Sequence, residues 1–444
     1  MKKTFYSWGN ISHVHSEYLT LENRYKKISF NRNQKVQYLT IGKGRSYGDV
    51  GLNSQGLMIE TKLLNRIITI DEKNQTITCE SGCTFEEIIH FLIPRGFFLS
   101  VTPGTKFITL GGAIANDVHG KNHHSSGTFG NHVLQFELLR SDGNTYLCSS
   151  TENSDYFFAT IGGLGLTGII LWATFQIKNI HSSDMNIEKI SFNDKKEFYE
   201  LNEQSHKNFE YTVSWFDCSY FIKSKGNLRG IYSRGNHSDS LKLNQKHPLT
   251  IYKNSISKIP FSNLPLINIP YFLHSLNSIY FNLNLLKAKK RRLPYESYFY
   301  PLDGIPNWNT FYGKKGFYQH QSVIPLTHCE LVLKEISTVI KKYHHTSFIS
   351  VLKTFGSIPS RGHLRFARPG ITLSLDFKNE GAKTHSMFLE LNEIIKQANG
   401  ALNPSKDSFM DSSHFLKLLS CDWNHFSRFI DPQFQSDLYK RILA

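Results

Sequence analysis

The loop Gly42-Lys43-Gly44-Arg45-Ser46-Tyr47-Gly48-Asp49 has the composition of an anion-binding site, and it follows an apolar run at 38–41. Three glycines within seven residues allow main-chain N–H groups to converge on an anion such as a phosphate. No Gly-Lys-Ser/Thr follows at the spacing of a P-loop, so that kind of site is not predicted. Two interpretations stay open: an anion-binding loop, or a tight turn that uses glycine for steric reasons.

A second glycine motif, Gly163-Leu164-Gly165-Leu166-Thr167-Gly168, has the G-x-G-x-x-G spacing of dinucleotide-binding folds. Those folds need a helix directly after the glycines, so that the pyrophosphate meets the helix N-terminus. Residues 169–175 are instead β-branched and aromatic, which predicts a strand. A Rossmann fold is therefore disfavoured.

Histidines concentrate in a third segment, which begins at Pro103-Gly104-Thr105. Four of them fall within fourteen residues: His119, His123, His124 and His132. Gly120 interrupts any helix that would align His119 with His123, and the pattern lacks the carboxylate of H-E-x-x-H and a nearby cysteine, so we predict no metal site. Small residues in this segment allow the backbone to approach a large flat ligand instead: Gly111, Gly112, Ala113 and Ala115. A histidine-rich loop packed for structural reasons is the alternative.

The composition limits the class of protein. The 444 residues are 40% hydrophobic and 20% charged, which is typical of a globular chain of two or three domains. The six cysteines form no C-x-x-C pair, so neither a disulfide framework nor a zinc ribbon is predicted. The net charge of +15 favours an anionic partner: nucleic acid, a phosphorylated small molecule or an acidic membrane surface. We find no signal peptide and no long apolar run, and expect a cytoplasmic protein or one held peripherally at a membrane.

Short strands and a few helices must position these segments. Strands are predicted at 57–60, 67–70 and 76–80 from their β-branched residues. A helix is predicted over 85–92, because Thr84 and Glu87 form a capping box in front of a helical apolar pattern.

Beyond Asp184 glycines become scarce, and a second domain is expected to begin there. The polar stretch 224–246 is predicted to be loops, and amphipathic helices are predicted at 329–341 and 388–396. The predicted fold class is α+β.

Taken together, the three glycine- and histidine-containing segments resemble the FAD-binding half of the vanillyl-alcohol-oxidase superfamily and, within it, the decaprenylphosphoryl-ribose oxidases. The likeness covers nearly the whole chain. Its further segments are 215–217, 300–303, Trp308-Asn309, 316–321, 351–356, 370–377 and 406–408.

The resemblance implies a PCMH-type FAD-binding domain of two subdomains, with an inserted α+β substrate domain built on an antiparallel sheet. Residues 1–183 would form the FAD-binding domain, 184–400 the substrate-binding domain, and 401–444 a C-terminal segment that returns to the FAD-binding domain. The positions that match FAD-binding residues are Gly42, Gly44, Arg45, Ser46, Tyr47, Gly48, Gly104, Thr105, Gly111, Gly112, Ala115, His119, Asn122 and Ile170. Ser46 stands about where many related flavoenzymes tether FAD to a histidine, so non-covalent FAD is expected.

The same resemblance assigns roles on the substrate side. Lys406 matches the family's active-site lysine, which would act as a base or orient an alkoxide; an ordinary surface lysine is the alternative. His119 could assist in proton handling. Gln319, Gln321 and Lys353 match polar residues of the substrate pocket. The chain departs from the family at Ser374, which replaces a cysteine, and at Asn403 and Phe299, which replace tyrosines, and this puts the exact sugar in doubt.

The predicted function is FAD-dependent oxidation of a secondary hydroxyl of a polyprenyl-phosphoryl pentose to the keto-sugar. A short-chain dehydrogenase/reductase would then return the keto-sugar with inverted configuration, as in cell-envelope polysaccharide synthesis. The enzymatic alternative is oxidation of a free sugar, alditol or aldonolactone. A nucleic-acid-binding protein has only the net charge in its favour, because no known nucleic-acid-binding motif is present.

One segment bears on membranes. Apolar and aromatic residues between Ile259 and Phe281 lead into a basic cluster at Lys287, Lys289, Lys290, Arg291 and Arg292. Three prolines argue against one long helix here. The stretch is interpreted either as a buried loop with a charged end or as a peripheral contact with anionic lipid.

Overall fold

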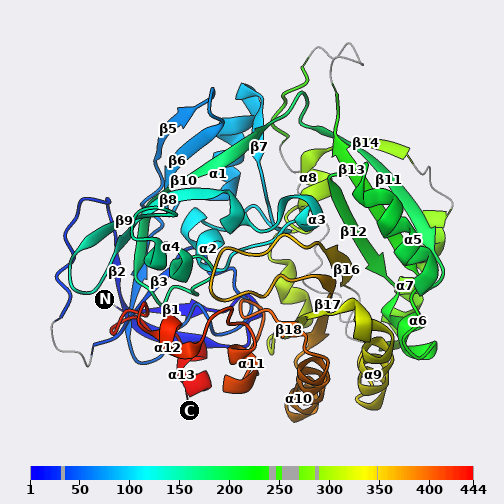
Figure 1. Cartoon of the computed structure of the whole chain (residues 1–444). Helices are drawn as coiled ribbons and strands as arrows, with labels where there is room; N and C mark the ends of the chain where they lie inside the picture. Colours follow the sequence, from blue (N-terminus) through cyan, green and yellow to red (C-terminus); the bar gives the residue numbers. More distant parts are fainter. Residues whose placement is uncertain are drawn as a thin grey trace.

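The computed structural model of the chain describes residues 2–31, 36–239, 247–252, 270–285, 290–347 and 349–443. Helices pack on three sheets within these residues, which confirms the α+β prediction. Figure 1 shows two sheets on one side of the molecule and the largest sheet on the other.

The first sheet carries the glycine loop. Its order is β1-β2-β4-β3, formed by Lys2–Tyr6, His13–Thr20, Leu57–Glu60 and Tyr38–Ile41. Strand β3 ends directly before Gly42, so the parallel pair of β3 and β4 fixes the start of the loop. The outer edge of β3 is covered by the C-terminal segment, because Tyr38 bridges Phe434 and its N–H donates to the Gln433 carbonyl at 2.7 Å.

The second sheet is antiparallel around a long central strand, β10 (Ile169–Asn179). The other strands are β5 (Ile67–Asp71), β6 (Thr76–Glu80), β7 (Phe97–Leu99), β8 (Val133–Leu139) and β9 (Thr145–Ser149). A strand thus follows the G-x-G-x-x-G motif, as predicted. The predicted capping box before α1 (Phe85–Leu92) is also confirmed, with Glu87 N–H donating to Thr84 Oγ1 at 3.2 Å.

The third sheet has eight antiparallel strands in the order β14-β11-β13-β12-β16-β17-β15-β18. Their bounds are Lys290–Pro294, Asp184–Phe192, Gly230–His237, Tyr211–Phe216, Ser350–Phe355, Gly370–Lys378, Phe317–Ile324 and Ala401–Leu402. The chain passes from the second sheet to the third between Asn179 and Asp184. Strand β18 belongs to the third sheet although it lies at the start of the predicted C-terminal segment.

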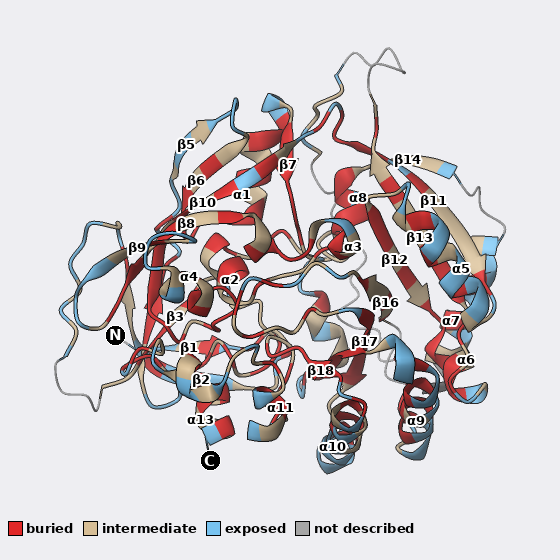
Figure 2. Cartoon of the chain, viewed as in Figure 1, coloured by how far each residue is buried: buried red, intermediate tan, exposed pale blue. Residues whose placement is uncertain are grey.

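Helices cover these sheets and carry the loops of the cavity. Besides α1 they are α2 (Leu110–Ala115), α3 (His123–Ser126), α4 (Ser154–Thr160), α5 (Lys195–His206), α6 (Cys218–Lys223), α7 (Pro270–Leu285), α8 (Tyr295–Phe299), α9 (Cys329–Lys342), α10 (Ala382–Gln397), α11 (Ser412–Leu416), α12 (Trp423–Ser427) and α13 (Asp437–Leu443). Figure 2 shows their inner faces buried and the outer faces of α5, α9 and α10 exposed.

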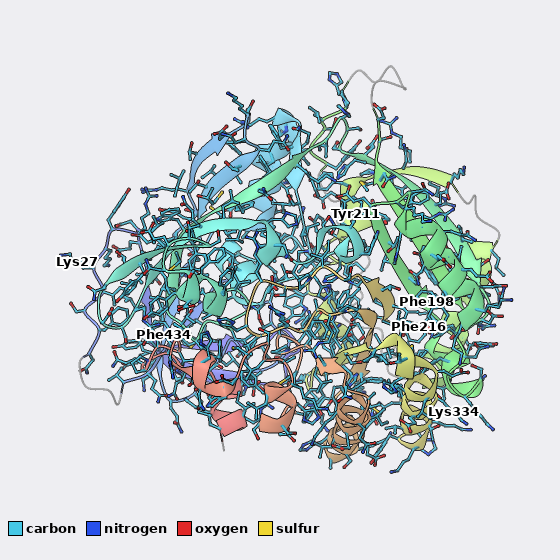
Figure 3. All side chains as sticks on the ribbon, viewed as in Figure 1. Lys27, Phe198, Tyr211, Phe216, Lys334 and Phe434 are labelled. Atoms are coloured by element: carbon cyan, nitrogen blue, oxygen red, sulfur yellow. The ribbon has the colours of Figure 1, made fainter. Side chains whose placement is uncertain are left out.

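Two large hydrophobic cores stabilise the described residues. Phe198 and Phe216 belong to the core between the third sheet and its helices, whereas Tyr211 belongs to the core around the second sheet (Figure 3). The lysine at position 334 lies on the exposed face of α9.

Two predictions are corrected by the structure. The stretch 224–246 contains β13, because Ile231 and Tyr232 are buried between β11 and β12. Helix α10 begins six residues before the predicted start, at Ala382. Helix α7 begins at Pro270, the last of the three prolines, where the missing N–H costs no intrahelical bond.

Candidate active site

The predicted site residues meet at one cavity of about 940 Å³ between the first two sheets and the third. Every predicted cofactor-binding and substrate-binding residue except Asn122 lines it. Asn122 is a correction: it is fully buried, and its Nδ2 donates to the Ser100 carbonyl at 2.8 Å. That amide therefore supports the loop from behind. The contacts of the other residues with FAD or substrate stay predictions.

The glycine loop is fixed against the C-terminal segment. Tyr47 N–H donates to the Ser405 carbonyl at 2.9 Å. A Cβ at Gly48 would lie 1.7 Å from the Asp407 carbonyl oxygen, so only glycine permits this approach. Arg441 bridges Asp49 at 3.0 Å and Asp407 at 3.2 Å. The same contact thus positions both the loop and the residue next to Asp407, Lys406.

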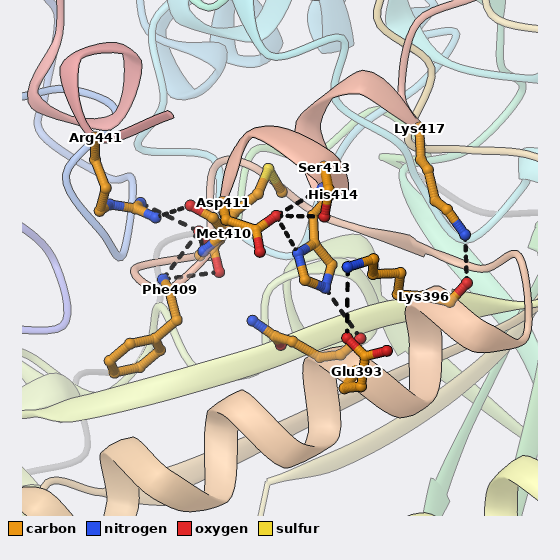
Figure 4. A network of polar contacts seen from close by, with 11 residues as sticks. Glu393, Lys396, Phe409, Met410, Asp411, Ser413, His414, Lys417 and Arg441 are labelled. Carbon is orange, nitrogen blue, oxygen red and sulfur yellow. Dashed lines mark hydrogen bonds and ion pairs between the residues drawn. The ribbon is translucent and has the colours of Figure 1, made fainter. Parts of the chain in front are cut away.

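Asp407 in turn organises the chain that follows it. Its carboxylate accepts hydrogen bonds from the backbone N–H groups of Phe409 at 3.1 Å and Met410 at 2.7 Å (Figure 4). Farther along, Asp411 caps α11 through His414 N–H at 2.9 Å. These bonds fix the turn next to Lys406, and none of them involves the side chain of Lys406.

The glycine side of the cavity fits FAD. A Cβ at Gly104 would meet no atom within 4 Å, and one at Gly112 would meet only Thr109 Oγ1, at 3.1 Å, so both positions open onto free space. Several buried polar atoms of lining residues have no hydrogen-bond partner among the described residues, including Thr40 Oγ1, Arg45 Nε, Ser81 Oγ and Asn116 Oδ1. A flat ligand with a pyrophosphate and polar ring edges would satisfy such atoms.

Another part of the cavity lining holds buried charge. Lys406 Nζ lies 3.5 Å from the centroid of the Tyr47 ring. The exposed part of its side chain faces the cavity, and burial lowers its pKa to about 7, opposed by Asp376. Burial raises the pKa of Asp376 to about 7, and Gln319 Nε2 donates to it at 2.5 Å. Both groups therefore titrate near neutral pH, and each favours the charged form of the other.

A hydrogen-bond chain fixes the tautomer of His119. Ser405 N–H donates to Asn403 Oδ1 at 3.0 Å, so Asn403 Nδ2 donates to Gln321 Oε1 at 2.8 Å. Gln321 Nε2 then donates to His119 Nε2 at 3.0 Å. The imidazole proton consequently lies on Nδ1, which is 3.4 Å from Lys353 Nζ. The bond to Nδ1 requires a neutral Lys353 amine.

Burial favours the neutral form of both partners, so His119 is neutral at pH 7 and Lys353 becomes neutral above about pH 8. Burial lowers the pKa of Lys353 to about 8 and the pKa of His119 well below its ordinary value, with Lys353 adding to the effect on His119. Lys121 lies on the same wall and donates to the Phe299 carbonyl at 3.0 Å, and burial lowers its pKa to about 7. An anion that entered here would raise all three pKa values and pair with the resulting charges.

Sequence reasoning missed Lys121 and Asp376. Lys121 directly follows the His119-Gly120 pair, and Asp376 comes two residues after Ser374 in β17, so the period-2 alternation of a strand places both on one face. That alternation was the available signal for Asp376. No local pattern marks Lys121, because its partner at Phe299 is 178 residues away.

Comparison with known proteins settles the family. Residues 26–149 match the family model described as an FAD binding domain. The decaprenylphosphoryl-β-D-ribose oxidase of Mycolicibacterium smegmatis is 34% identical over 421 residues, which covers 90% of this chain and 88% of that protein. The chain belongs to the decaprenylphosphoryl-ribose oxidase family. It is an FAD-dependent oxidoreductase that acts on CH–OH groups, with the α+β fold of PCMH-type flavoenzymes.

More distant relatives share only part of the chain. The L-gulonolactone oxidase of Mus musculus is 29% identical over 151 residues, which is 34% of this chain and 33% of that protein. The bovine L-gulonolactone oxidase is 26% identical over 172 residues, 38% of each chain. Family membership excludes the nucleic-acid-binding alternative as the main function of the chain.

Proposed function

We propose that this enzyme oxidises a secondary hydroxyl of a polyprenyl-phosphoryl pentose, such as decaprenylphosphoryl-β-D-ribose, to the keto-sugar. The observation that carries the proposal is the grouping of Lys121, Lys353 and Lys406 at one end of the cavity. A phosphodiester that arrives beside Lys121 and Lys353 would raise the lowered pKa values of both lysines and pair with their charges. The relative from Mycolicibacterium smegmatis, which aligns with 90% of this chain, is named for such a substrate.

The residues of this end divide the chemical work. FAD, when bound, supplies a hydride acceptor beside the sugar carbon. Lys406, neutral above about pH 7, takes the proton of the hydroxyl group and passes it toward Asp376. His119, with its proton held on Nδ1 toward Lys353, keeps its ring orientation and helps to place the sugar. Gln319, Gln321, Ser374 and Asn403 are the proposed contacts for the other hydroxyl groups.

The lining of the cavity supports a lipid-linked substrate. It includes Val213 and Ile231 of the third sheet and Tyr280 of α7. On α7 the neighbouring residues Ile279 and Leu283 are one helical turn apart, and 55% and 49% of their surfaces are exposed. A polyprenyl chain could leave along this apolar route to a membrane surface.

The predicted membrane segment is described only in part. Residues 259–269, Lys287 and Lys289 lie outside the described residues. Strand β14 uses two members of the basic cluster for internal pairs, Lys290 with Glu188 at 3.2 Å and Arg292 with Asp184 at 2.7 Å. No helix of the described residues is long and apolar enough to span a membrane. We propose peripheral contact through the exposed face of α7, which anionic lipid would strengthen.

That contact is tested with the double variant Ile279→Ser/Leu283→Ser. We expect it to bind phosphatidylglycerol vesicles less tightly than the wild type while keeping its FAD. The matched control is Leu331→Ser/Leu389→Ser, which changes equally exposed leucines on α9 and α10. If both double variants bind vesicles like the wild type, α7 is not the contact.

The keto product requires a second enzyme for epimerisation. We propose that a short-chain dehydrogenase/reductase reduces it from the opposite face, so that the pair of reactions inverts one carbon for cell-envelope polysaccharide synthesis. Incubation with the purified reductase and NADH should convert the substrate into its epimer, and the reductase alone should not.

FAD is proposed to be bound non-covalently, because Ser46 cannot form the covalent link of a histidine. Acid or heat should release all of the flavin from the purified protein. Flavin fluorescence that stays with the denatured chain on a gel would contradict this.

The decisive experiment for the substrate is anaerobic bleaching of the flavin. Farnesylphosphoryl-β-D-ribose, ribose 5-phosphate, free ribose and L-gulonolactone are supplied in turn, and loss of oxidised-flavin absorbance reports hydride transfer without an acceptor. We expect the lipid-linked sugar to bleach the flavin fastest. The second candidate, oxidation of a free sugar or aldonolactone, is favoured by the partial likeness to gulonolactone oxidases, and it prevails if the free compounds react faster.

A further inference from the structure

A cluster of possible metal ligands lies outside the flavin cavity. One ligand atom each of His363, Cys421 and His425 lies within 4.8 Å of the others, and all three side chains are half-buried. Among the described residues this is the only such group of three or more histidine, cysteine and acidic side chains. None of the three lines the cavity of the active site.

The fold brings two distant segments together at this cluster. Leu364 and Leu419 form an antiparallel bridge, and Ser420 N–H donates to the His363 carbonyl at 2.8 Å. In the C-terminal segment, Cys421 directly precedes Asp422, the N-cap of α12, and His425 lies in the first turn of that helix (Figure 1). Asp422 caps this helix by accepting from His425 N–H at 2.7 Å, which fixes the turn that carries both side chains.

The side chains are free to act as ligands. His363 Nε2 is buried and has no hydrogen-bond partner among the described residues. Cys421 is a free thiol. His414 of the same C-terminal segment is different, because both of its ring nitrogens have partners, at Asp411 and Asn392.

We propose that His363, Cys421 and His425 bind one zinc ion, with water in the fourth position. Two imidazoles and one thiolate form a ligand set that zinc prefers. Neighbouring ligand atoms of a tetrahedral zinc site lie roughly 3.3 to 3.7 Å apart, given Zn–N and Zn–S distances of about 2.0 and 2.3 Å. Side-chain rotations that move each ligand atom by about 1 Å bring the three atoms from within 4.8 Å of one another to these distances. The Cys421 thiol gives its proton to solvent when zinc binds.

The ion would link the loop between β16 and β17, which carries His363, to the C-terminal segment, which carries Cys421 and His425. That loop also carries Phe366, which lines the active-site cavity and packs on the His119 ring with centroids 5.9 Å apart. Zinc would therefore stabilise one wall of the cavity without taking part in the oxidation.

Cobalt titration of the FAD-loaded enzyme tests the proposal. Tetrahedral Co²⁺ with a thiolate ligand absorbs at longer wavelengths than oxidised flavin, and Zn²⁺ should displace it at one equivalent. We expect Cys421→Ser, His363→Gln and His425→Gln each to weaken Co²⁺ and Zn²⁺ binding about 10-fold or more. The control His181→Gln, at an exposed histidine outside the cluster, should bind like the wild type.

Thermal unfolding gives a second readout, because a ligand that binds the folded state raises the melting temperature. Zinc should raise that temperature in the wild type and in His181→Gln but not in Cys421→Ser, and flavin content verifies that each variant is folded. The proposal is overturned if the wild type gives no cobalt spectrum, or if binding at one equivalent persists in the double variant His363→Gln/Cys421→Ser.

Discussion

The cofactor end and the catalytic end of the active-site cavity are lined by different kinds of chemical groups. The cofactor end is lined by backbone, and its glycines at 104 and 112 leave room for a flat ligand. The catalytic end consists of side chains whose charge is suppressed by burial, including Lys353 and Lys406. A change of shape should therefore damage the first end, whereas a change of proton affinity should damage the second.

The largest effect is expected at the cofactor end. Gly112→Val should abolish FAD binding, because its branched side chain would fill the space that the cofactor needs. Absorbance of the purified protein measures flavin occupancy. The smaller Gly112→Ala should keep part of it, and Gly304→Val should keep all of it, since a Cβ at Gly304 meets only the Pro301 carbonyl oxygen, at 4.0 Å. Full occupancy in Gly112→Val would remove this position from the cofactor site.

The next effect separates the two ends. Lys406→Met keeps the apolar stem and removes the amine, so we expect normal FAD content with turnover reduced roughly 10² to 10⁴-fold, the range for a lost acid–base group. Single-turnover flavin reduction is the measurement. Lys334→Met, at an exposed position of α9, is the matched control. A normal rate in Lys406→Met would show that this lysine does not act as the base.

The pH dependence tests the same end without mutation. A lysine whose pKa is lowered to about 7 is protonated below that pH and is a base above it. The rate of flavin reduction should therefore rise about 10-fold per pH unit below pH 7 and level off above it, with an apparent pKa that belongs to Lys406 and Asp376 together. In Lys406→Met this rise should disappear. A rate that falls through pH 7 would require a different base.

The smallest effect is expected from the hydrogen-bond chain behind His119. Asn403→Ala removes the group that orients Gln321, so the tautomer of His119 is no longer fixed. We expect flavin reduction to slow about 10-fold, in line with about 1.4 kcal/mol for a buried hydrogen bond. Asn403→Asp should keep the bond from Ser405 but lose the one to Gln321, and a similar loss in both variants would support the chain. No loss in either would show that His119 is held by other contacts.

Local sequence patterns predicted the cofactor end well. The capping box of α1 and strand β10 after the second glycine motif depend on neighbouring residues, and the structure has them as predicted. The resemblance to a family supplied the other predicted cofactor-binding positions, and all of them except Asn122 line the cavity.

The catalytic end was harder to predict because its properties arise from burial by distant segments. Burial lowers the pKa values of Lys121 and His119, and Lys353, which is 234 residues from His119, adds to both effects. The strand β13 escaped prediction for a related reason. Its glycines at 230 and 235 read as loop residues, yet a Cβ at Gly230 would lie 2.2 Å from the Trp215 carbonyl oxygen in the neighbouring strand.

The bridge between Tyr38 and Phe434 has a consequence for protein synthesis. The edge of β3 pairs with Phe434, a residue 396 positions later in the chain. The N–H group of Tyr47 likewise finds its hydrogen-bond acceptor only at the carbonyl of Ser405. At about 5 to 20 residues per second, the ribosome needs roughly 20 to 80 s to make the intervening chain. Until then the glycine loop lacks the neighbours that hold it. The cofactor can thus be captured only after nearly the whole polypeptide has left the ribosome, and a truncated product should emerge colourless.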